Sequence, residues 1–175
     1  MRRHYLLLCL LFLLMLPGCK SQQEPRQPIK FYYPKTEISY GASDGVLSHE
    51  LRESASLSKE TVISLYLKGP RAEGLISPFP ENINIIHFSV QEKAATLVLS
   101  DSYATLSGLD ISIASVCLSK TVMELTGAES VTLSCQTQPL GGETRIIISE
   151  SDLVLYDDSM GHVSEGSTPT ASSSQ

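Results

Sequence analysis

The side chains that could do chemistry in this sequence are few and lie far apart. His49 stands between Ser48 and Glu50, and His87 stands in an apolar segment. A histidine beside a serine and a carboxylate has the residue types of a nucleophile and its base, but neighbours on a strand point to opposite faces. Ser48 and His49 therefore cannot act on one substrate atom. We expect both histidines to be ordinary, partly exposed strand residues, and we predict no catalytic residues and no enzymatic activity.

Acidic side chains near the end of the chain come closest to a metal site. Asp152, Asp157, Asp158 and Glu165 offer the oxygen ligands that calcium prefers. They lack the ligand spacing and the central glycine of a calcium-binding loop, so we expect a solvated acidic surface. The sequence also lacks a phosphate-binding glycine loop, a nucleophile elbow and an H-E-x-x-H pair. We predict no metal and no cofactor.

Cysteine usage gives no disulfide framework. Of the four cysteines, Cys9 and Cys19 fall in or next to an apolar leader, which leaves Cys117 and Cys135 for the folded part. No C-x-x-C pair and no cluster of histidine and cysteine offers a metal site. The two cysteines are most simply small buried hydrophobic residues. A disulfide between them in an oxidising exterior remains an open alternative.

The N-terminus has the organisation of an export signal. Arg2-Arg3 precedes an apolar run over residues 5–16, which is too short for a comfortable spanning helix and has the length of a signal core. The run ends in Leu16-Pro17-Gly18-Cys19, which resembles a bacterial lipobox. This predicts cleavage after Gly18, attachment of a diacylglyceryl group with acyl chains such as palmitate at Cys19, and anchoring on the extracytoplasmic face of the cell membrane. A signal peptide without lipid is the alternative.

The charge balance argues against nucleic acid and anionic lipid as partners. The chain has 13 basic and 19 acidic side chains and a formal net charge of −6. Arg2 and Arg3 are the only charged residues up to Gly18, so 11 basic side chains remain against the 19 acidic ones after it. An acidic domain has few cations to exchange for the counterions of a nucleic acid, and anionic lipid repels it. We predict no nucleic acid partner, and membrane attachment through lipid alone.

One domain accounts for most of the chain. The sequence predicts strands at 29–33, 46–52, 83–90, 94–99, 131–133, 145–148 and 152–156, and helices at 58–67 and 110–126. Ser56 or Ser58 can cap the first helix, Gly69-Pro70 should stop it, and Gly127 should end the second. A strand over 61–67 is the rival of the first helix. The main order β-β-α-β-β-α-β predicts an α+β two-layer sandwich, with both helices on one face of a small sheet. The predicted divisions are a signal peptide at 1–18, a tether at 19–28, the domain at 29–157 and a disordered tail at 158–175.

The second predicted helix is apolar on two sides. Its main stripe, at helical spacing, consists of Ile111, Ala114, Leu118, Val122 and Leu125. Beyond that stripe, Ile113, Val116 and Met123 fall on another side. Either a neighbouring loop such as residues 74–80 covers this second side, or it is a surface for a partner. The second alternative predicts weak self-association or docking on another protein.

Several short segments, in their order along the chain, carry a family resemblance. They are Leu67-Lys68-Gly69-Pro70, Gly74–Pro80 (GLISPFP), Ala95–Ser100 (ATLVLS), Leu106-Ser107-Gly108, Lys120-Thr121-Val122 and Gly127–Val131 (GAESV). Residues 30–150 resemble the GerMN domain of sporulation and spore-germination lipoproteins from Gram-positive spore formers. The resemblance implies a non-catalytic module, related to ring-building motifs, whose partners are other envelope or sporulation proteins.

These observations lead to one expected function and one alternative. We expect a lipid-anchored, non-catalytic protein of the cell envelope that acts as an adaptor or assembly module in sporulation or germination. The alternative is an extracytoplasmic lipoprotein that binds a ligand or peptidoglycan.

Overall fold

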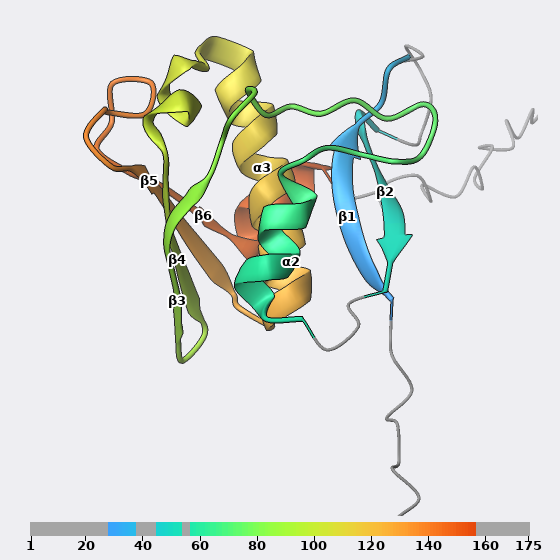
Figure 1. Ribbon diagram of the computed structural model, residues 1–175, viewed down its shortest axis with the longest axis horizontal. Helices are drawn as coiled ribbons and strands as arrows, with labels where there is room; N and C mark the ends of the chain where they lie inside the picture. Colours follow the sequence, from blue (N-terminus) through green and yellow to red (C-terminus); the bar gives the residue numbers. More distant parts are fainter. Residues whose placement is uncertain (1–27, 38–44, 54–56, 157–175) are drawn as a thin grey trace, which may run out of the picture.

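Two β-sheets enclose a layer formed by helices α2 and α3 (Figure 1). The computed structural model describes residues 28–37, 45–53 and 57–156. Its strands are β1 (Ile29–Pro34), β2 (Leu47–Arg52), β3 (Ile85–Gln91), β4 (Ala94–Leu99), β5 (Ser130–Cys135) and β6 (Ile146–Ser149). Its helices are α2 (Lys59–Tyr66) and α3 (Gly108–Thr126), with 3-10 helices η1 (Asp101–Thr105) and η2 (Glu150–Tyr156). The predicted signal peptide, Cys19 and the predicted tail lie outside the described residues, as do Asp157, Asp158 and Glu165.

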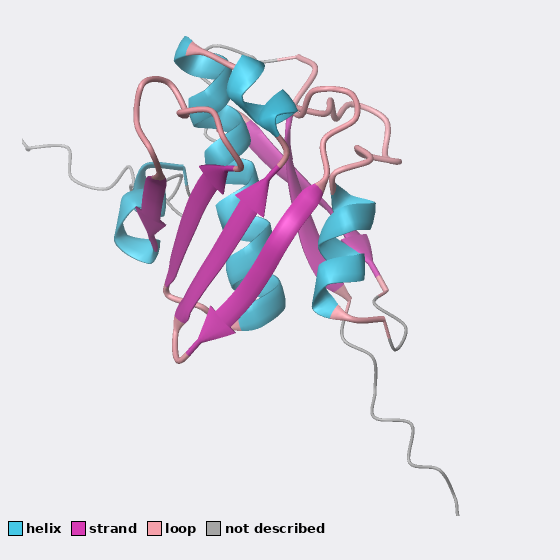
Figure 2. Ribbon diagram, turned by 60° about the vertical axis from the view of Figure 1, so that its left-hand side comes forward, coloured by secondary structure: helices cyan, strands magenta, loops and turns pink. Residues whose placement is uncertain are grey.

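The strands form two sheets. β3, β4, β5 and β6 lie in this order in one sheet, and β1 pairs with β2 in a separate antiparallel sheet. β4 and β5 are parallel and are connected through α3, whereas the other neighbours are antiparallel. Figure 2 shows α2 and α3 behind the larger sheet, with β1 and β2 beyond them. The predicted α+β class and the order of the main elements are confirmed, but the first hairpin covers the helices from the opposite side.

One predicted strand is wrong. Residues Glu150–Tyr156, which include the strand predicted at 152–156, form the 3-10 helix η2. A carboxylate oxygen of Asp152 accepts a hydrogen bond from the Ser149 N–H at 2.8 Å and another from the Ser149 hydroxyl at 2.6 Å. An acid three residues after a serine that reaches back to its N–H forms half of a capping box. This contact favours a helical turn over a continued strand.

Helix α3 is the central element of the core. Ala114, Leu118 and Val122 of its main stripe are fully buried against the larger sheet, where β4 and β5 contribute Leu97 and Leu133. The helix ends at Gly127, whose φ of +72° is the left-handed conformation that glycine adopts without a steric penalty. The Gly127 N–H donates to the Met123 carbonyl at 2.8 Å and closes the last turn.

The second apolar side of α3 is not an open surface. Val116 is buried and packs with Leu47 of β2, Ile148 of β6 and Leu153 of η2. Ile113 and Met123 are half-buried against the same cluster. Val116 therefore belongs to the core, and of the three only Ile113 and Met123 remain partly exposed on this side. The cover comes from β2 of the first hairpin together with β6 at the edge of the larger sheet and the η2 turn that follows it.

Helix α2 is held by a cap at its start and by aromatic packing near its end. The Ser58 hydroxyl accepts a hydrogen bond from the Thr61 N–H at 3.2 Å, as the predicted helix required. Tyr66 is fully buried, with its ring centroid 5.3 Å from that of Phe31 and 5.2 Å from that of Phe79. The hydroxyl of Tyr33 donates to the Tyr66 carbonyl at 2.8 Å. These contacts join α2 to β1. The last turn of α2 contains no basic side chain.

Candidate functional site

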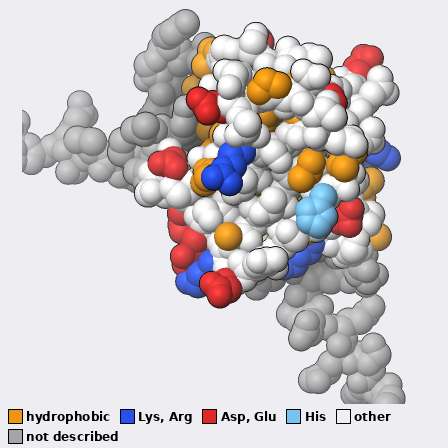
Figure 3. Space-filling view, turned by 90° about the vertical axis from the view of Figure 1, so that its left-hand side faces the viewer, with side chains coloured by type: hydrophobic (Ala, Val, Ile, Leu, Met, Phe, Trp, Pro, Cys, Tyr) orange, Lys and Arg blue, Asp and Glu red, His pale blue; other side chains and the backbone are white. Residues whose placement is uncertain are grey.

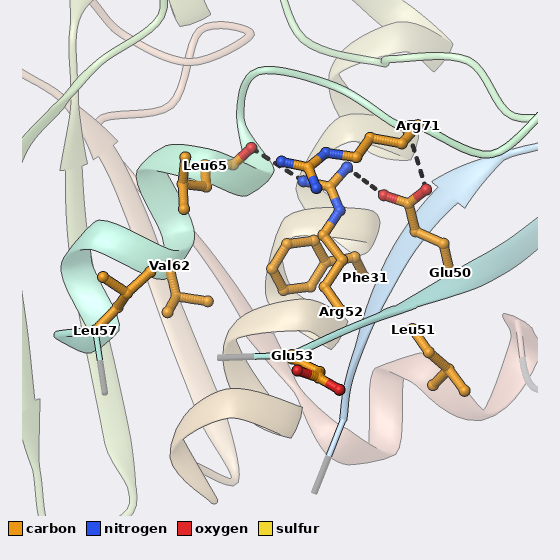
Figure 4. Close-up of a pocket in the computed structure, with 9 residues that line it drawn as sticks. All are labelled: Phe31, Glu50, Leu51, Arg52, Glu53, Leu57, Val62, Leu65 and Arg71. Carbon is orange, nitrogen blue, oxygen red and sulfur yellow. Dashed lines mark hydrogen bonds and ion pairs between the residues drawn. The ribbon is translucent and has the colours of Figure 1, made fainter. Parts of the chain in front are cut away.

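A pocket opens between the end of β2, helix α2 and the loop that follows α2 (Figure 4). Its volume is about 310 Å³. Four aliphatic side chains and one aromatic ring share the lining with two arginines and two glutamates: Leu51, Leu57, Val62, Leu65, Phe31, Arg52, Arg71, Glu50 and Glu53. The pocket therefore combines an apolar wall with a concentration of charge.

Arg52 supplies the positive charge that the end of α2 lacks. Its guanidinium donates to the Leu65 carbonyl at 3.3 Å and to the Gly69 carbonyl at 2.8 Å. The Leu65 carbonyl belongs to the last turn of the helix, where partial negative charge accumulates and a cation is stabilising, and the Gly69 carbonyl belongs to the turn that follows. The guanidinium also lies 4.8 Å from the centroid of the Phe31 ring, in a cation–π contact. One residue of β2 thus fixes the end of a helix that begins seven residues later in the sequence.

Glu50 secures the loop after α2. Its carboxylate accepts hydrogen bonds from the backbone N–H groups of Arg71 at 2.9 Å and Ala72 at 2.8 Å, and it forms an ion pair with Arg52. Burial opposes ionisation, but the two backbone hydrogen bonds and the Arg52 guanidinium outweigh it and lower the pKa of Glu50. The carboxylate is therefore ionised at neutral pH, and its oxygens are engaged by the protein.

The Arg71 guanidinium is the cation that remains at the mouth of the pocket. Figure 4 shows it extending over the guanidinium of Arg52, while Glu53 points away from both. Among the described residues, the Arg71 side chain has no carboxylate partner. Leu57, towards the start of α2 on the other side of the pocket, is 46% exposed. The lining has no serine, threonine, cysteine or histidine, so this arrangement is equipped to bind an anionic group and has no nucleophile with a base.

The structure does not bring the candidate catalytic residues of the sequence together. His49 and His87 are both exposed strand residues, as expected, and they lie in different sheets. His49 packs against Tyr32, with ring centroids 5.6 Å apart. The register pairs His87 with Val98 on the face of the larger sheet opposite to the helices. Figure 3 shows this face, on which one histidine is exposed with hydrophobic and acidic side chains near it.

The remaining candidates are also separate. Asp152 is exposed and engaged by Ser149, and no group of three or more histidine, cysteine, aspartate or glutamate side chains in the described part of the chain could hold a metal. Cys117 and Cys135 are free cysteines. Burial raises the pKa of Cys117 to about 12, which keeps it a thiol at neutral pH. The simplest interpretation, a small buried hydrophobic residue, describes Cys117, whereas Cys135 is half-buried at the end of β5.

The pocket was not predicted from the sequence, although local signals for it exist. Glu50 and Arg52 are two apart on a strand and therefore project from the same face. A helix without a basic residue in its last turn, followed by Gly69-Pro70, needs an external donor for its final carbonyls. What the sequence could not supply is which strand would provide that donor.

Replacing Glu50 with glutamine should remove a pH-dependent part of the stability. Because folding lowers the Glu50 pKa from its ordinary value of 4.5, the ionised carboxylate stabilises the fold above that pH, and this stability is lost as the pH falls through the lower, folded value. We expect Glu50→Gln to lower the free energy of unfolding by about 2 kcal/mol at pH 7. The difference from the unchanged chain should shrink towards pH 3.

Urea unfolding followed by circular dichroism between pH 3 and pH 7 measures this effect. Glu53→Gln is the matched control, because Glu53 is exposed and has no partner assigned in the pocket. A difference between Glu50→Gln and the unchanged chain that stays constant down to pH 3 would contradict the role of the ionised carboxylate.

The whole fold is similar to that of solved structures. The first GerMN domain of the sporulation protein GerM from Bacillus subtilis is similar, with a TM-score of 0.54 and 13% identity over 71% of this chain and 98% of that domain. The chain has the fold of a GerMN domain. Tandem GerMN domains of the same protein give a TM-score of 0.49 and 19% identity, over 67% of this chain and 43% of that structure.

The GerMN resemblance is thus confirmed at the level of the fold. A scan against models of protein families gives no match, and a search among curated proteins gives none either. The chain spans less than half the length of the tandem GerMN structure. In this GerMN fold, the pocket lies at the junction of the first hairpin with α2.

Proposed function

We propose that the protein is a lipid-anchored, non-catalytic adaptor or assembly module of the cell envelope that serves sporulation or germination. The observation that carries the proposal is the GerMN fold, which matches almost the full length of the first GerMN domain of a sporulation protein. The order of the GerMN-like segments along the sequence supports the same conclusion. The partners proposed for it are other envelope or sporulation proteins.

The chemistry of the pocket supports a non-catalytic role. Its buried charges, Glu50 and Arg52, are engaged by backbone groups and by each other. A general acid or base needs a pKa near the working pH and a position open to substrate. Glu50 has neither property, because its pKa is lowered and its oxygens are engaged. The groups that remain accessible, Arg71 and Leu57, are suited to binding.

The lipobox-like sequence at the N-terminus supports the proposed location. Cys19 would carry the lipid, after cleavage behind Gly18, and would place the domain on the extracytoplasmic face of the membrane. Within the part of the chain that the structure describes, no helix combines the length and the apolar composition needed to cross a bilayer. The acidic surface gives little electrostatic affinity for anionic lipid, so the proposal assigns attachment to the acyl chains.

Site-directed photocrosslinking of the full chain tests the adaptor role. A photoreactive side chain at Leu57, at the mouth of the pocket, or at Ile147, on the outer face of β6, would be introduced in sporulating cells. Both residues are exposed and lie far apart in the fold, so each serves as a control for the other. We expect at least one position, but not both equally, to yield a defined adduct with another envelope protein.

A different result would favour the alternative function. The pocket, whose volume lies at the lower end of the range for small-molecule sites, is the observation that supports an extracytoplasmic ligand- or peptidoglycan-binding lipoprotein. Saturable binding of the purified chain to cell walls, without any protein adduct, would replace the adaptor proposal with this one. Turnover of wall fragments that is lost on substitution of His49 or His87 would contradict both.

A further inference from the structure

The pocket beside Arg71 has the features of a site for one class of ligand. Its charged and apolar groups are separated: Arg71 and Arg52 lie on the side of the loop after α2, and Leu57 and Val62 lie towards the start of α2 (Figure 4). A ligand that matches both sides needs an anionic end and an aliphatic body. Such a ligand would find a partner only if the protein's own carboxylates leave one of the two guanidinium groups unpaired.

The described residues leave one cation uncompensated. Two guanidinium groups meet beside the loop after α2, but Glu50, the only carboxylate next to them in the described part of the chain, is already paired with Arg52 and with two backbone N–H groups. The Arg52 Nε is buried and, within the described residues, has no hydrogen-bond acceptor. A buried donor without an acceptor is costly, and an anion near Arg71 would reduce the repulsion between the two guanidinium groups. The two arginines and two glutamates of the lining balance in number, but Glu53 points away, so the Arg71 guanidinium and the Arg52 Nε remain without acceptors among the described residues.

The apolar wall selects among anions. Phe31 and Val62 are buried behind the pocket, and Leu57 leaves about half of its surface exposed at its rim. Phosphate and sulfate are strongly hydrated on every side and gain nothing from an aliphatic wall. A carboxylate attached to a short aliphatic group pairs with the flat guanidinium in a bidentate manner and covers the exposed leucine.

We propose that this pocket binds an aliphatic carboxylate. Its carboxylate pairs with the Arg71 guanidinium, and its aliphatic group packs on Leu57 and Leu65. The volume of about 310 Å³ fits a ligand no larger than one or two amino-acid residues. Two sources share this chemistry: the last residue of a peptide, and a free short-chain acid. The inference concerns the pocket alone and depends neither on the adaptor role nor on the lipid anchor.

Binding to the purified full chain in mild detergent, which holds the chain in solution with or without a lipid anchor, tests the proposal. The probes are radiolabelled N-acetyl-leucine, as the end of a peptide, 4-methylpentanoate, as a free acid, and N-acetyl-leucinamide, which lacks the charge. Equilibrium dialysis should give a dissociation constant of about 1 mM or lower for at least one of the two acids. The amide should bind at least about tenfold more weakly than N-acetyl-leucine. The tighter of the two acids identifies the source.

Two matched variants locate the site. Arg71→Gln removes the free guanidinium but keeps the backbone N–H that Glu50 accepts from, so the fold should be retained. We expect it to weaken acid binding at least about tenfold, whereas Arg145→Gln, at another exposed arginine before β6, should change it less than about twofold. Leu57→Asp should abolish binding through loss of apolar contact and through repulsion.

Three results would overturn the proposal. One is the absence of binding by either acid at about 10 mM, well above the expected constant. Another is equal affinity for N-acetyl-leucine and its amide, which would mean that the charge plays no part. The third is an equal loss in Arg71→Gln and Arg145→Gln, which would assign the effect to overall charge. A thermal melt of each variant excludes unfolding as the cause of lost binding.

Discussion

Replacement of Arg52 with alanine should destabilise the fold by about 3 kcal/mol, the largest effect expected from a single charged side chain of the described part. Three contributions combine. Glu50, whose side chain is 8% exposed, would lose its counter-charge. The carbonyls of Leu65 and Gly69 would lose their donors, and Phe31 would lose its cation–π contact. Urea unfolding followed by circular dichroism at pH 7 measures the loss.

Two further variants separate these contributions. Arg52→Lys keeps the charge, but an ammonium lacks the planar set of donors that reaches the Leu65 and Gly69 carbonyls and the Glu50 carboxylate together. It should therefore recover only part of the lost stability. Arg71→Ala, at the exposed neighbour, should cost less than about 0.5 kcal/mol. An Arg52→Ala variant that is no less stable than Arg71→Ala would show that the end of α2 does not depend on β2.

Replacement of Cys19 with alanine should release the protein from the membrane. Each buried CH₂ of an acyl chain contributes about 0.8 kcal/mol to membrane binding, so a diacylglyceryl group dominates every other contribution that this acidic chain can make. We expect the variant to move from the membrane to the soluble fraction, or to stay attached only through an uncleaved leader. Fractionation after a high-salt wash, with an immunoblot for cleavage, distinguishes these outcomes.

The matched control is Cys9→Ala, which changes the other cysteine of the leader. Cys9 lies within the apolar run and precedes the predicted cleavage point, so its loss should leave anchoring unchanged. A Cys19→Ala protein that is processed normally and still remains with salt-washed membranes would contradict the lipobox prediction.

Sequence signals that act over a few residues predicted where the two helices begin and end. Ser58 caps α2, Gly69-Pro70 follows its end and Gly127 ends α3, each as the sequence indicated. Such signals act within a few residues and need no knowledge of the rest of the chain. The capping pair of Ser149 and Asp152 is an equally local signal, and it favours the helical turn found in place of the predicted last strand.

Long-range placement could not be predicted in the same way. The sequence showed that α3 is apolar on two sides, but apolarity does not identify what covers a surface, and Val116 proved to be core. The pocket could not be predicted for the same reason. Arg52 reaches Gly69 only because the first hairpin folds back onto α2, and no periodicity reports that contact. A pairing of distant elements is decided by the packing of the whole core.

The placement of β1 has a mechanical consequence. The described domain begins with this strand, so tension applied to the N-terminal end of the chain enters the fold at Ile29. β1 is held by β2, and the Tyr32 N–H donates to the Thr121 hydroxyl of α3 at 3.0 Å. If tension pulls β1 and β2 away, the cluster around Val116 loses Leu47 and meets water. The larger sheet, whose strands do not pair with β1 or β2, would be the last part of the domain to bear the load.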